Sequence, residues 1–249
     1  MPEKQRLDVL LVERGFFSTR SRARDAIARK TVLVQGKVVD KAGQVVLSDA
    51  EIIVSDPARN YVSRAALKLL AALDEFPVRT QAINALDIGV STGGFTQVLL
   101  ERGAAHVIAV DVGHGQLAQS LINNPAITLY EGLNARDLEK NHLQGLDVQL
   151  VVSDVSFISL KLALPPALSL AAKGAQAVLL VKPQFEIGRE GIGKGGLLKN
   201  PADGEKIAED LFAWLNEQQG WRAKGLRPSP IEGGDGNVEY LLYGEKCND

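Results

Sequence analysis

Four charged residues stand in otherwise apolar segments, where an ionised side chain is costly unless it has a partner. Lys68 interrupts the run SRAALKLLAAL, and Glu239 stands within GNVEYLLY. Asp154 and Lys182 each follow an apolar run, VQLVVS and AVLLV. The carboxyl ends of parallel strands face the ligand crevice of an open α/β sheet, so we expect Asp154 and Lys182 to meet there. Taken singly, each of the four is more simply explained by a structural salt bridge.

A glycine-rich turn, LDIGVSTGGFTQVLL at residues 86–100, offers a second site. Its glycines lack the G-x-G-x-x-G spacing of a dinucleotide site, which disfavours NAD. The turn is similar to that of S-adenosylmethionine enzymes, in which the backbone approaches the amino-acid end of the cofactor and an acid stands at the strand end. Asp111 ends the next strand, where a carboxylate accepts both ribose hydroxyls, whereas Asn134 is equally explained as a plain turn residue. The expected cofactor-binding residues are Asp87, Gly89, Ser91, Gly93, Gly94, Phe95, Asp111 and Asn134.

The elements that must position these residues alternate between strand and helix. Unbroken apolar strands between amphipathic helices are typical of a parallel sheet buried on both faces. The last 28 residues differ, because they predict two extended segments joined by a glycine-rich turn. We expect an α/β fold of the Rossmann-like methyltransferase class with a terminal antiparallel hairpin. The expected strands are 83–88, 107–111, 127–130, 148–153 and 177–182, and the expected helices start near 63 and span 94–102, 116–123, 160–172 and 205–218.

The N-terminal segment has a different pattern, predicting a small α+β domain. An apolar helical face at 7–12 ends at Gly15, and Ser18 or Thr19 caps a second helix. A hairpin at 31–39 and strands at 45–47 and 51–54 follow. The first 60 residues carry a formal excess of three positive charges and the remainder an excess of five negative charges, which favours two domains. We place them at 1–56 and 63–249, with a linker at 57–62.

This N-terminal segment resembles the S4 RNA-binding module in Arg6-Leu7-Asp8, in the stretch from Ser18 to Ala23 and in the hairpin. It departs from the family pattern at Lys30, where Gly is usual, and at Gln35, where Asn is usual. The resemblance implies that the basic side chains bind RNA phosphates, although a solvated helix face is the simpler alternative for a run of charge. The expected RNA-binding residues are Arg6, Arg20, Arg22, Arg24 and Lys30.

Together, Lys68, Asp154, Lys182 and Glu239 are similar in order, spacing and flanking sequence to the tetrad of the FtsJ-like ribose 2′-O-methyltransferases. An S4 module before such a domain resembles the TlyA family, which is also labelled haemolysin A. The resemblance implies S-adenosylmethionine-dependent methylation of cytidine ribose in bacterial ribosomal RNA, with these four residues catalytic. A neutral lysine at 182 would accept the hydroxyl proton, and the carboxylates would orient the two lysines.

Composition limits where the protein can act and what it can bind. Charged residues make up 23% of the chain, and no apolar run approaches the ~20 residues that span a bilayer. Cys247 has no partner for a disulfide, and the three histidines are too dispersed for a metal pattern, so we expect a reducing cytoplasm and no metal or membrane partner. The expected partner is ribosomal RNA or a ribosomal subunit. Two rivals stay open: an RNA-binding regulator with an inactive methyltransferase domain, and a cytolysin.

Overall fold

The computed structural model describes residues 2–247. They form two compact units that divide after Tyr61. Within this part of the chain, no helix combines the length and the apolar composition that crossing a membrane requires.

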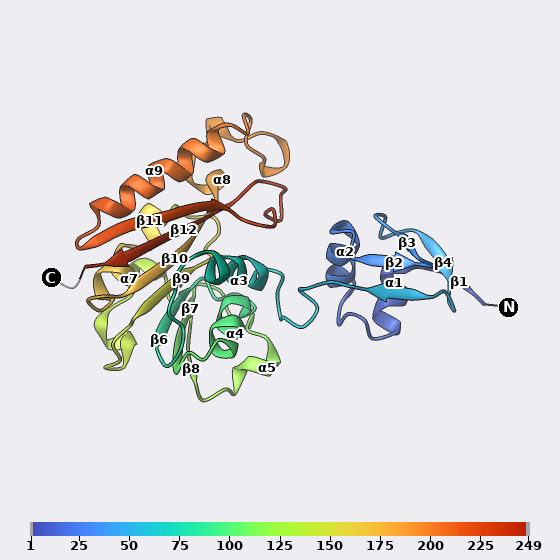
Figure 1. Cartoon of the computed structure of the whole chain (residues 1–249), viewed down its shortest axis with the longest axis horizontal. Coiled ribbons are helices and arrows are strands. Elements are labelled where there is room, and N and C mark those ends of the chain that lie inside the picture. Colours follow the sequence, from blue (N-terminus) through green and yellow to red (C-terminus); the bar gives the residue numbers. More distant parts are fainter. Residues whose placement is uncertain (1, 248–249) are drawn as a thin grey trace. The chain divides into compact units, whose positions relative to one another are not determined.

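The N-terminal unit is a small α+β domain around its own core. Thr19 caps the second helix by accepting the Arg22 N–H, and the fully buried Leu7, Leu11 and Ile27 join the two helices to the strands. One antiparallel sheet has the order β3-β2-β5, and a second pairs β1 with β4. Its elements, all but β5 labelled in Figure 1, are β1 Lys4–Arg6, α1 Leu7–Glu13, α2 Arg20–Ala28, β2 Val32–Val34, β3 Lys37–Val38, β4 Val45–Leu47 and β5 Ile52–Val54.

Both departures from the S4 pattern fall where the backbone is left-handed. Lys30 has a φ of 60° and Gln35 a φ of 49°. Gln35 and Gly36, the latter at 73°, both have positive φ, which is the requirement of a type I′ hairpin turn. The predicted hairpin therefore forms, but at two positions where Gly or Asn would adopt the conformation at lower cost.

The C-terminal unit is built on one seven-stranded sheet with the order β11-β12-β10-β9-β6-β7-β8. The strands from β10 to β8 are parallel, and β12 runs antiparallel to both β10 and β11. The predicted parallel sheet with a terminal hairpin is confirmed. The bounds are α3 Ala66–Glu75, β6 Asn84–Ile88, α4 Gly94–Glu101, β7 His106–Asp111, α5 Gln119–Ile122, β8 Ile127–Glu131, β9 Leu150–Ser153, α6 Leu160–Ala163, α7 Pro165–Leu170, β10 Gln176–Val181, α8 Pro183–Glu186, α9 Asp203–Glu217, β11 Trp221–Pro228 and β12 Tyr240–Lys246.

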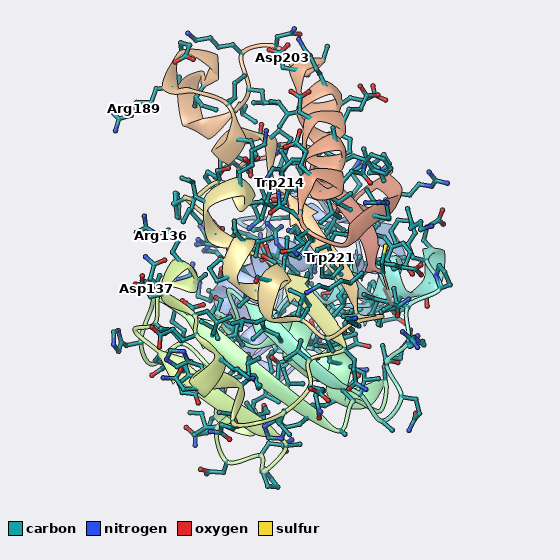
Figure 2. The ribbon with its side chains drawn as sticks, turned by 90° about the vertical axis from the view of Figure 1, so that its left-hand side faces the viewer. Arg136, Asp137, Arg189, Asp203, Trp214 and Trp221 are labelled. Atoms are coloured by element: carbon teal, nitrogen blue, oxygen red, sulfur yellow. The ribbon has the colours of Figure 1, made fainter. Side chains whose placement is uncertain are left out.

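Helices cover both faces of this sheet. Along β7, Ile108 and Val110 belong to the core that includes α6, α7 and α9, whereas Ala109 faces Leu117 and Leu121 on the other side. Alternate residues of a strand point to opposite faces, so an apolar run such as HVIAV fills two cores at once. Figure 2 shows α9 and the strand that follows it, with Trp214 and Trp221 labelled where they enter the first core.

Two helices are shorter than their patterns predict. Pro165 has no N–H to donate, so the expected helix at 160–172 breaks into α6 and α7 on either side of Leu164. The expected helix at 116–123 is a single turn, because Ala118 is extended (ψ 139°) and the preceding residues line a cavity. The helix expected to begin near Ser63 begins at Ala66, after a turn.

Candidate active site

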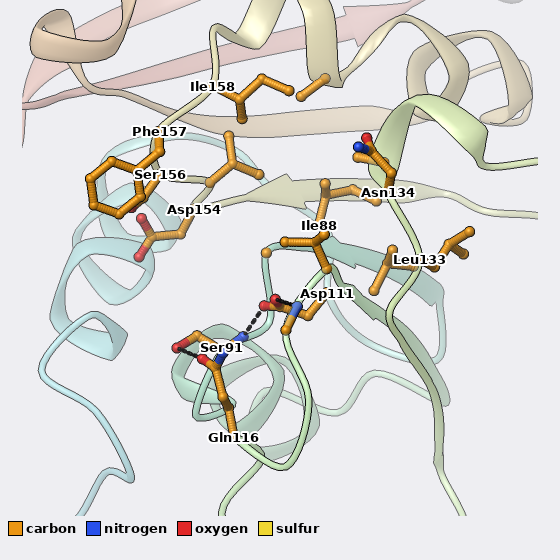
Figure 3. A pocket seen from close by; sticks show the side chains of 17 residues that line it. Ile88, Ser91, Asp111, Gln116, Leu133, Asn134, Asp154, Ser156, Phe157 and Ile158 are labelled. Carbon is orange, nitrogen blue, oxygen red and sulfur yellow. Dashed lines mark hydrogen bonds between the residues drawn. The ribbon is translucent and has the colours of Figure 1, made fainter.

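The strand order reverses between β6 and β9, which is where an open α/β sheet leaves a crevice at the carboxyl ends of its strands. A cavity of about 580 Å³ lies there (Figure 3). That volume falls within the range of small-molecule and cofactor sites. Five expected site residues line it, namely Gly89, Ser91, Asp111, Asn134 and Asp154.

Gly89 allows the two sides of the crevice to approach. Its φ is 87°, and a Cβ built on it would lie 3.0 Å from the carbonyl oxygen of Asp154. A side chain at this position would therefore be strained and would also push β6 away from the end of β9. The glycine is required both by its backbone conformation and by the close approach that forms the cavity floor.

Asp111 is held in place by backbone hydrogen bonds. Its Oδ2 accepts the N–H of Ser91 at 2.7 Å, and its Oδ1 accepts the N–H of Gly113 at 2.7 Å. Each carboxylate oxygen has a further lone pair, so the fixed side chain can still accept hydroxyl donors from the cavity. Figure 3 shows Asp111 beside Ser91 and Gln116. The hydroxyl of Ser91 donates a hydrogen bond to the side chain of Gln116.

Asp87 has a different position from the one its place in the turn predicts. It is fully buried and is absent from the lining of the cavity. Its Oδ2 accepts the hydroxyl of Thr96 at 2.6 Å, and burial raises the pKa of Asp87 to about 7. Asp87 therefore joins β6 to α4 beneath the turn. Gly93 is likewise behind the turn, packed against Leu117 and Leu121.

Asn134 holds a turn and also lines the cavity. It lines the cavity, and its Oδ1 accepts the backbone N–H and the Nε–H of Arg136. The amide nitrogen of Asn134 has no hydrogen bond of this kind within the turn, so it is the group available to a ligand.

A smaller cavity of about 140 Å³ continues from the first and contains Lys182. The Lys182 Nζ lies 2.6 Å from Asp154 Oδ1 and donates to Ser156 Oγ at 2.8 Å. Asp154 and Ser156 line both cavities. Lys182 thus lines the small cavity, and its ammonium group is fixed by two acceptors that line both cavities.

Lys68 and Glu239 form a second ion pair, with Nζ 2.5 Å from Oε2. Both side chains are almost completely buried, at 6% and 2% exposed. Lys68 lies one turn of α3 beyond Ala65, which lines the small cavity with Lys182. The four charged residues therefore form two pairs, Lys182 with Asp154 and Lys68 with Glu239, and each pair joins segments far apart in the sequence.

Two residues of this site were not singled out from the sequence. Ser156 is the second acceptor of Lys182. Phe157 lines the large cavity with 89% of its surface exposed and a φ of 65°, and its ring centroid lies 5.0 Å from that of Phe185. Its exposure and its left-handed backbone are both uncommon for a phenylalanine, and they distinguish it among the residues that line the cavity. The remaining expected residues, Gly94 and Phe95, line the small cavity.

The four arginines expected to bind RNA have partners within the N-terminal unit. Arg6, Arg20 and Arg24 all hydrogen bond to Asp8. Arg22 instead donates to the backbone carbonyls of Ala58, Arg59 and Tyr61, which attaches the residues after 56 to α2. Lys30 is exposed just after α2. Within residues 2–247, no three histidine, cysteine or acidic side chains are arranged to hold a metal ion.

Comparison with known proteins bears on both units. The S4 domain family model matches residues 5–52, and the FtsJ-like methyltransferase model matches residues 61–246. The chain is 43% identical over 246 residues to the 16S/23S rRNA (cytidine-2′-O)-methyltransferase TlyA of Mycobacterium tuberculosis, covering 98% of this chain and 90% of the relative. It is 38% identical over 239 residues to Hemolysin A of Brachyspira hyodysenteriae, covering 96% and 98%. A solved structure from Streptococcus thermophilus, 39% identical, superimposes with a TM-score of 0.76 over 100% of this chain and 90% of the other.

The sheet order, the crevice and these matches together define an FtsJ-like methyltransferase domain preceded by an S4 domain. Within that class, the chain belongs to the TlyA family.

Proposed function

We propose that this protein transfers a methyl group from S-adenosylmethionine to the 2′-hydroxyl of cytidine in bacterial ribosomal RNA. The observation that carries the proposal is the Lys182–Asp154 pair, in which Asp154 lines both the large and the small cavity and Lys182 lines the small one. The name of the Mycobacterium tuberculosis relative supports cytidine ribose as the target. Because ribosomal RNA is the proposed substrate, we also propose the cytoplasm as the place of action.

The large cavity fits the proposed cofactor. Asp111 supplies two fixed oxygens for ribose hydroxyls, and the left-handed Gly89 lets the backbone form the cavity floor without a side chain. Asn134 supplies an amide nitrogen on the same wall. When bound, S-adenosylmethionine supplies an activated methyl group, so the protein's task is to place the hydroxyl in line and remove its proton.

Lys182 would hold the target hydroxyl oxygen and, as its ammonium group passes one proton to Asp154, would take up the proton of the hydroxyl. Asp154 and Ser156 fix the Lys182 Nζ, and Asp154 lies 2.6 Å away as the final acceptor of the proton. The O–H electron pair would form the new O–C bond as the bond between the methyl carbon and the sulfonium sulfur breaks, and the proton would stay on the lysine and aspartate pair. General base catalysis of this kind contributes about 10²- to 10⁴-fold to a rate.

The Lys68–Glu239 pair would keep the net charge beside the reacting groups close to zero. A buried lysine whose partner is removed leaves an uncompensated charge, so Glu239 keeps the positive charge of Lys68 in place without repelling a cationic cofactor. Phe157, exposed at the rim of the large cavity, offers an aromatic face on which an unstacked base can lie.

Mass spectrometry of nucleosides tests the proposal directly. Purified protein, radiolabelled S-adenosylmethionine and unmodified ribosomal RNA should yield labelled 2′-O-methylcytidine, and Lys182→Ala should yield none. Label in a base, or in another nucleoside, would contradict the proposed target. Binding of RNA without transfer would instead favour an RNA-binding regulator.

A further inference from the structure

Three arginines of the N-terminal unit converge on one carboxylate. Arg6 ends β1, Asp8 lies in the first turn of α1, and Arg20 and Arg24 lie one turn apart on α2. Arg6 Nε is 3.0 Å from Asp8 Oδ1, while Arg20 and Arg24 approach Oδ2 at 3.0 and 2.9 Å. Three elements are therefore tied together at a single acid. We call Arg6, Arg20, Arg24 and Asp8 the arginine cluster.

The side chains of the arginine cluster differ in their exposure to solvent. The Asp8 side chain is completely buried, whereas the three arginine side chains are 48%, 50% and 52% exposed. The hydrogen bonds, that of Arg6 foremost, hold the pKa of Asp8 well below its usual range. Asp8 therefore stays ionised beneath the surface, and each guanidinium group has one side bound to it and one side facing solvent.

The charges of the arginine cluster do not cancel. Three guanidinium groups share one carboxylate, which leaves a residual charge of two. The guanidinium group has five N–H donors in a fixed plane, and the contacts with Asp8 occupy only one or two on each arginine. Arg6 is also confined on its other side, since its guanidinium atoms lie 3.4 to 3.5 Å from where a Cβ of Gly43 would stand.

An ordinary buried ion pair in the same unit shows the difference. Asp56 accepts from Arg29 at 2.8 Å, and the side chain of Arg29 is only 17% exposed. That pair is balanced and withdrawn from solvent, as expected of a purely structural contact. A structural contact needs one arginine, whereas the arginine cluster keeps two further cations at the surface.

We propose that Asp8 is a positioning residue for RNA, holding Arg6, Arg20 and Arg24 as one rigid array whose outward N–H groups bind two neighbouring phosphates of the RNA backbone. The residual charge of two matches two phosphodiester groups. Fixing the guanidinium groups beforehand reduces the side-chain ordering that binding otherwise requires. This inference rests on the proposed function, because it takes RNA as the substrate.

The negative charge of Asp8 makes the two possible effects of its removal on RNA affinity opposite in direction. Asp8→Asn removes a negative charge beside the RNA site, so electrostatics alone would tighten RNA binding. Loss of the array would weaken binding instead, by about ten-fold, the effect of losing one charge-assisted hydrogen bond. Asp56→Asn is the matched control, because it makes the same charge change at a buried acid of the same unit and should not weaken binding.

The experiment measures the affinity of the full-length protein for in vitro transcribed 23S ribosomal RNA by filter binding. Weaker binding by Asp8→Asn but not by Asp56→Asn, with S-adenosylmethionine affinity unchanged, supports the proposal. Binding by folded Asp8→Asn that equals or exceeds the wild type overturns it. Wild-type protein that methylates neither this RNA nor 16S ribosomal RNA would instead overturn the proposed function.

A second variant keeps the test decisive if Asp8→Asn unfolds the domain. Arg20→Lys with Arg24→Lys preserves both charges at half-exposed positions, but an ammonium group cannot span a carboxylate and a phosphate as a planar fork does. We expect several-fold weaker RNA binding with an unchanged circular dichroism spectrum. Wild-type affinity in this double variant would show that charge alone acts, and would overturn the proposal.

Discussion

Asp87, Asp111 and Asp154 stand near the carboxyl ends of neighbouring strands, but each has a different partner. Asp87 accepts a buried hydroxyl, Asp111 accepts two backbone N–H groups and Asp154 faces an ammonium group. Asp87 joins two elements, whereas for Asp111 and Asp154 we propose two other tasks, namely binding the cofactor and holding the base. Because the residues share a type, only substitutions at each position separate these tasks.

Replacing Lys182 should separate chemistry from binding. Lys182→Ala removes the proposed proton acceptor but leaves the lining of the large cavity intact, so we expect methyl transfer to fall at least 100-fold. Single-turnover assays measure this effect, and cofactor and RNA affinities should stay within a few fold. Lys161→Ala, at an exposed position on α6, serves as the control. Near-normal turnover would remove Lys182 from the mechanism.

Asp111 should act on cofactor affinity. Asp111→Ala deletes two oxygens from the cavity wall and frees the N–H groups of Ser91 and Gly113. We expect the binding free energy of S-adenosylmethionine to weaken by about 1.5 to 3 kcal/mol, as for charge-assisted hydrogen bonds. Calorimetry measures this change, with exposed Asp137→Ala as the comparison. Equal affinities for the two variants would mean that the ligand lies elsewhere.

Because the backbone of Lys30 is left-handed, we expect replacement of this residue by glycine to stabilise the protein. Lys30→Gly relieves a conformation that costs a side chain about 1 to 2 kcal/mol, so we expect the N-terminal unit to gain roughly 1 kcal/mol after the entropy of glycine is subtracted. Lys37→Gly, in β3, should lose about 0.5 to 1 kcal/mol instead. Thermal unfolding distinguishes the two signs. Destabilisation by Lys30→Gly would show that the lysine side chain makes a compensating contact.

At the scale of elements, the parallel strands of the large sheet were predictable because they are mostly apolar runs between helices. The helix ends were less predictable, since the pattern of residues 116–123 does not show that Ala118 is extended and that α5 begins only at Gln119. Pairings were the least predictable feature. Lys68 and Glu239 are 171 residues apart, and only the antiparallel return of β12 beside β10 brings them together. The sequence likewise identified the arginines of α2 without indicating that Asp8 connects two of them to β1.

The contact between β6 and α4 should make stability depend on pH. Burial raises the pKa of Asp87 to about 7 from an ordinary value of 3.8. Between these values the folded chain binds a proton that the unfolded chain has released, so the free energy of unfolding should decrease as pH rises from about 4 to 7. The slope attributable to this residue approaches 1.4 kcal/mol per pH unit at most.

Denaturant titrations at several pH values, for the wild type and for Asp87→Asn, isolate this contribution. The variant cannot titrate at position 87, so the difference between the two proteins should shrink as pH falls toward 4 and grow toward 7. Parallel curves for the two proteins would show that Asp87 is ionised throughout and that its buried Thr96 contact compensates for the charge.

At the scale of the whole molecule, the two units differ in the sign of their net charge. The first 60 residues have a positive excess and the rest a negative one, so the salt dependence of RNA binding should come mainly from the N-terminal unit. Arg20→Gln with Arg24→Gln should flatten the slope of log affinity against log salt by about 1.4 to 1.8 units, at roughly 0.7 to 0.9 per phosphate contact.

Arg22→Gln is the informative comparison for that slope. Its guanidinium group already donates to three backbone carbonyls of residues 58–61, so we expect a smaller change of slope and a larger loss of stability. Cofactor affinity should not change in either variant, because the cavity lies in the other unit. A slope unaltered by the double variant would identify the arginines as a solvated helix face.

The position of Glu239 on the final hairpin has a consequence for protein synthesis. The residues that line the large cavity end at Ala163, so they leave the ribosome well before β12 does. Until β12 arrives, Lys68 has no partner for its charge and β10 is an open edge of the sheet. A chain terminated by a premature stop codon after α9 would therefore keep the cavity-lining residues and lose the second ion pair. We therefore expect a chain that stops before the cavity-lining residues are complete and a chain that lacks only the last hairpin to be equally inactive. The two truncations nevertheless remove very different lengths of chain.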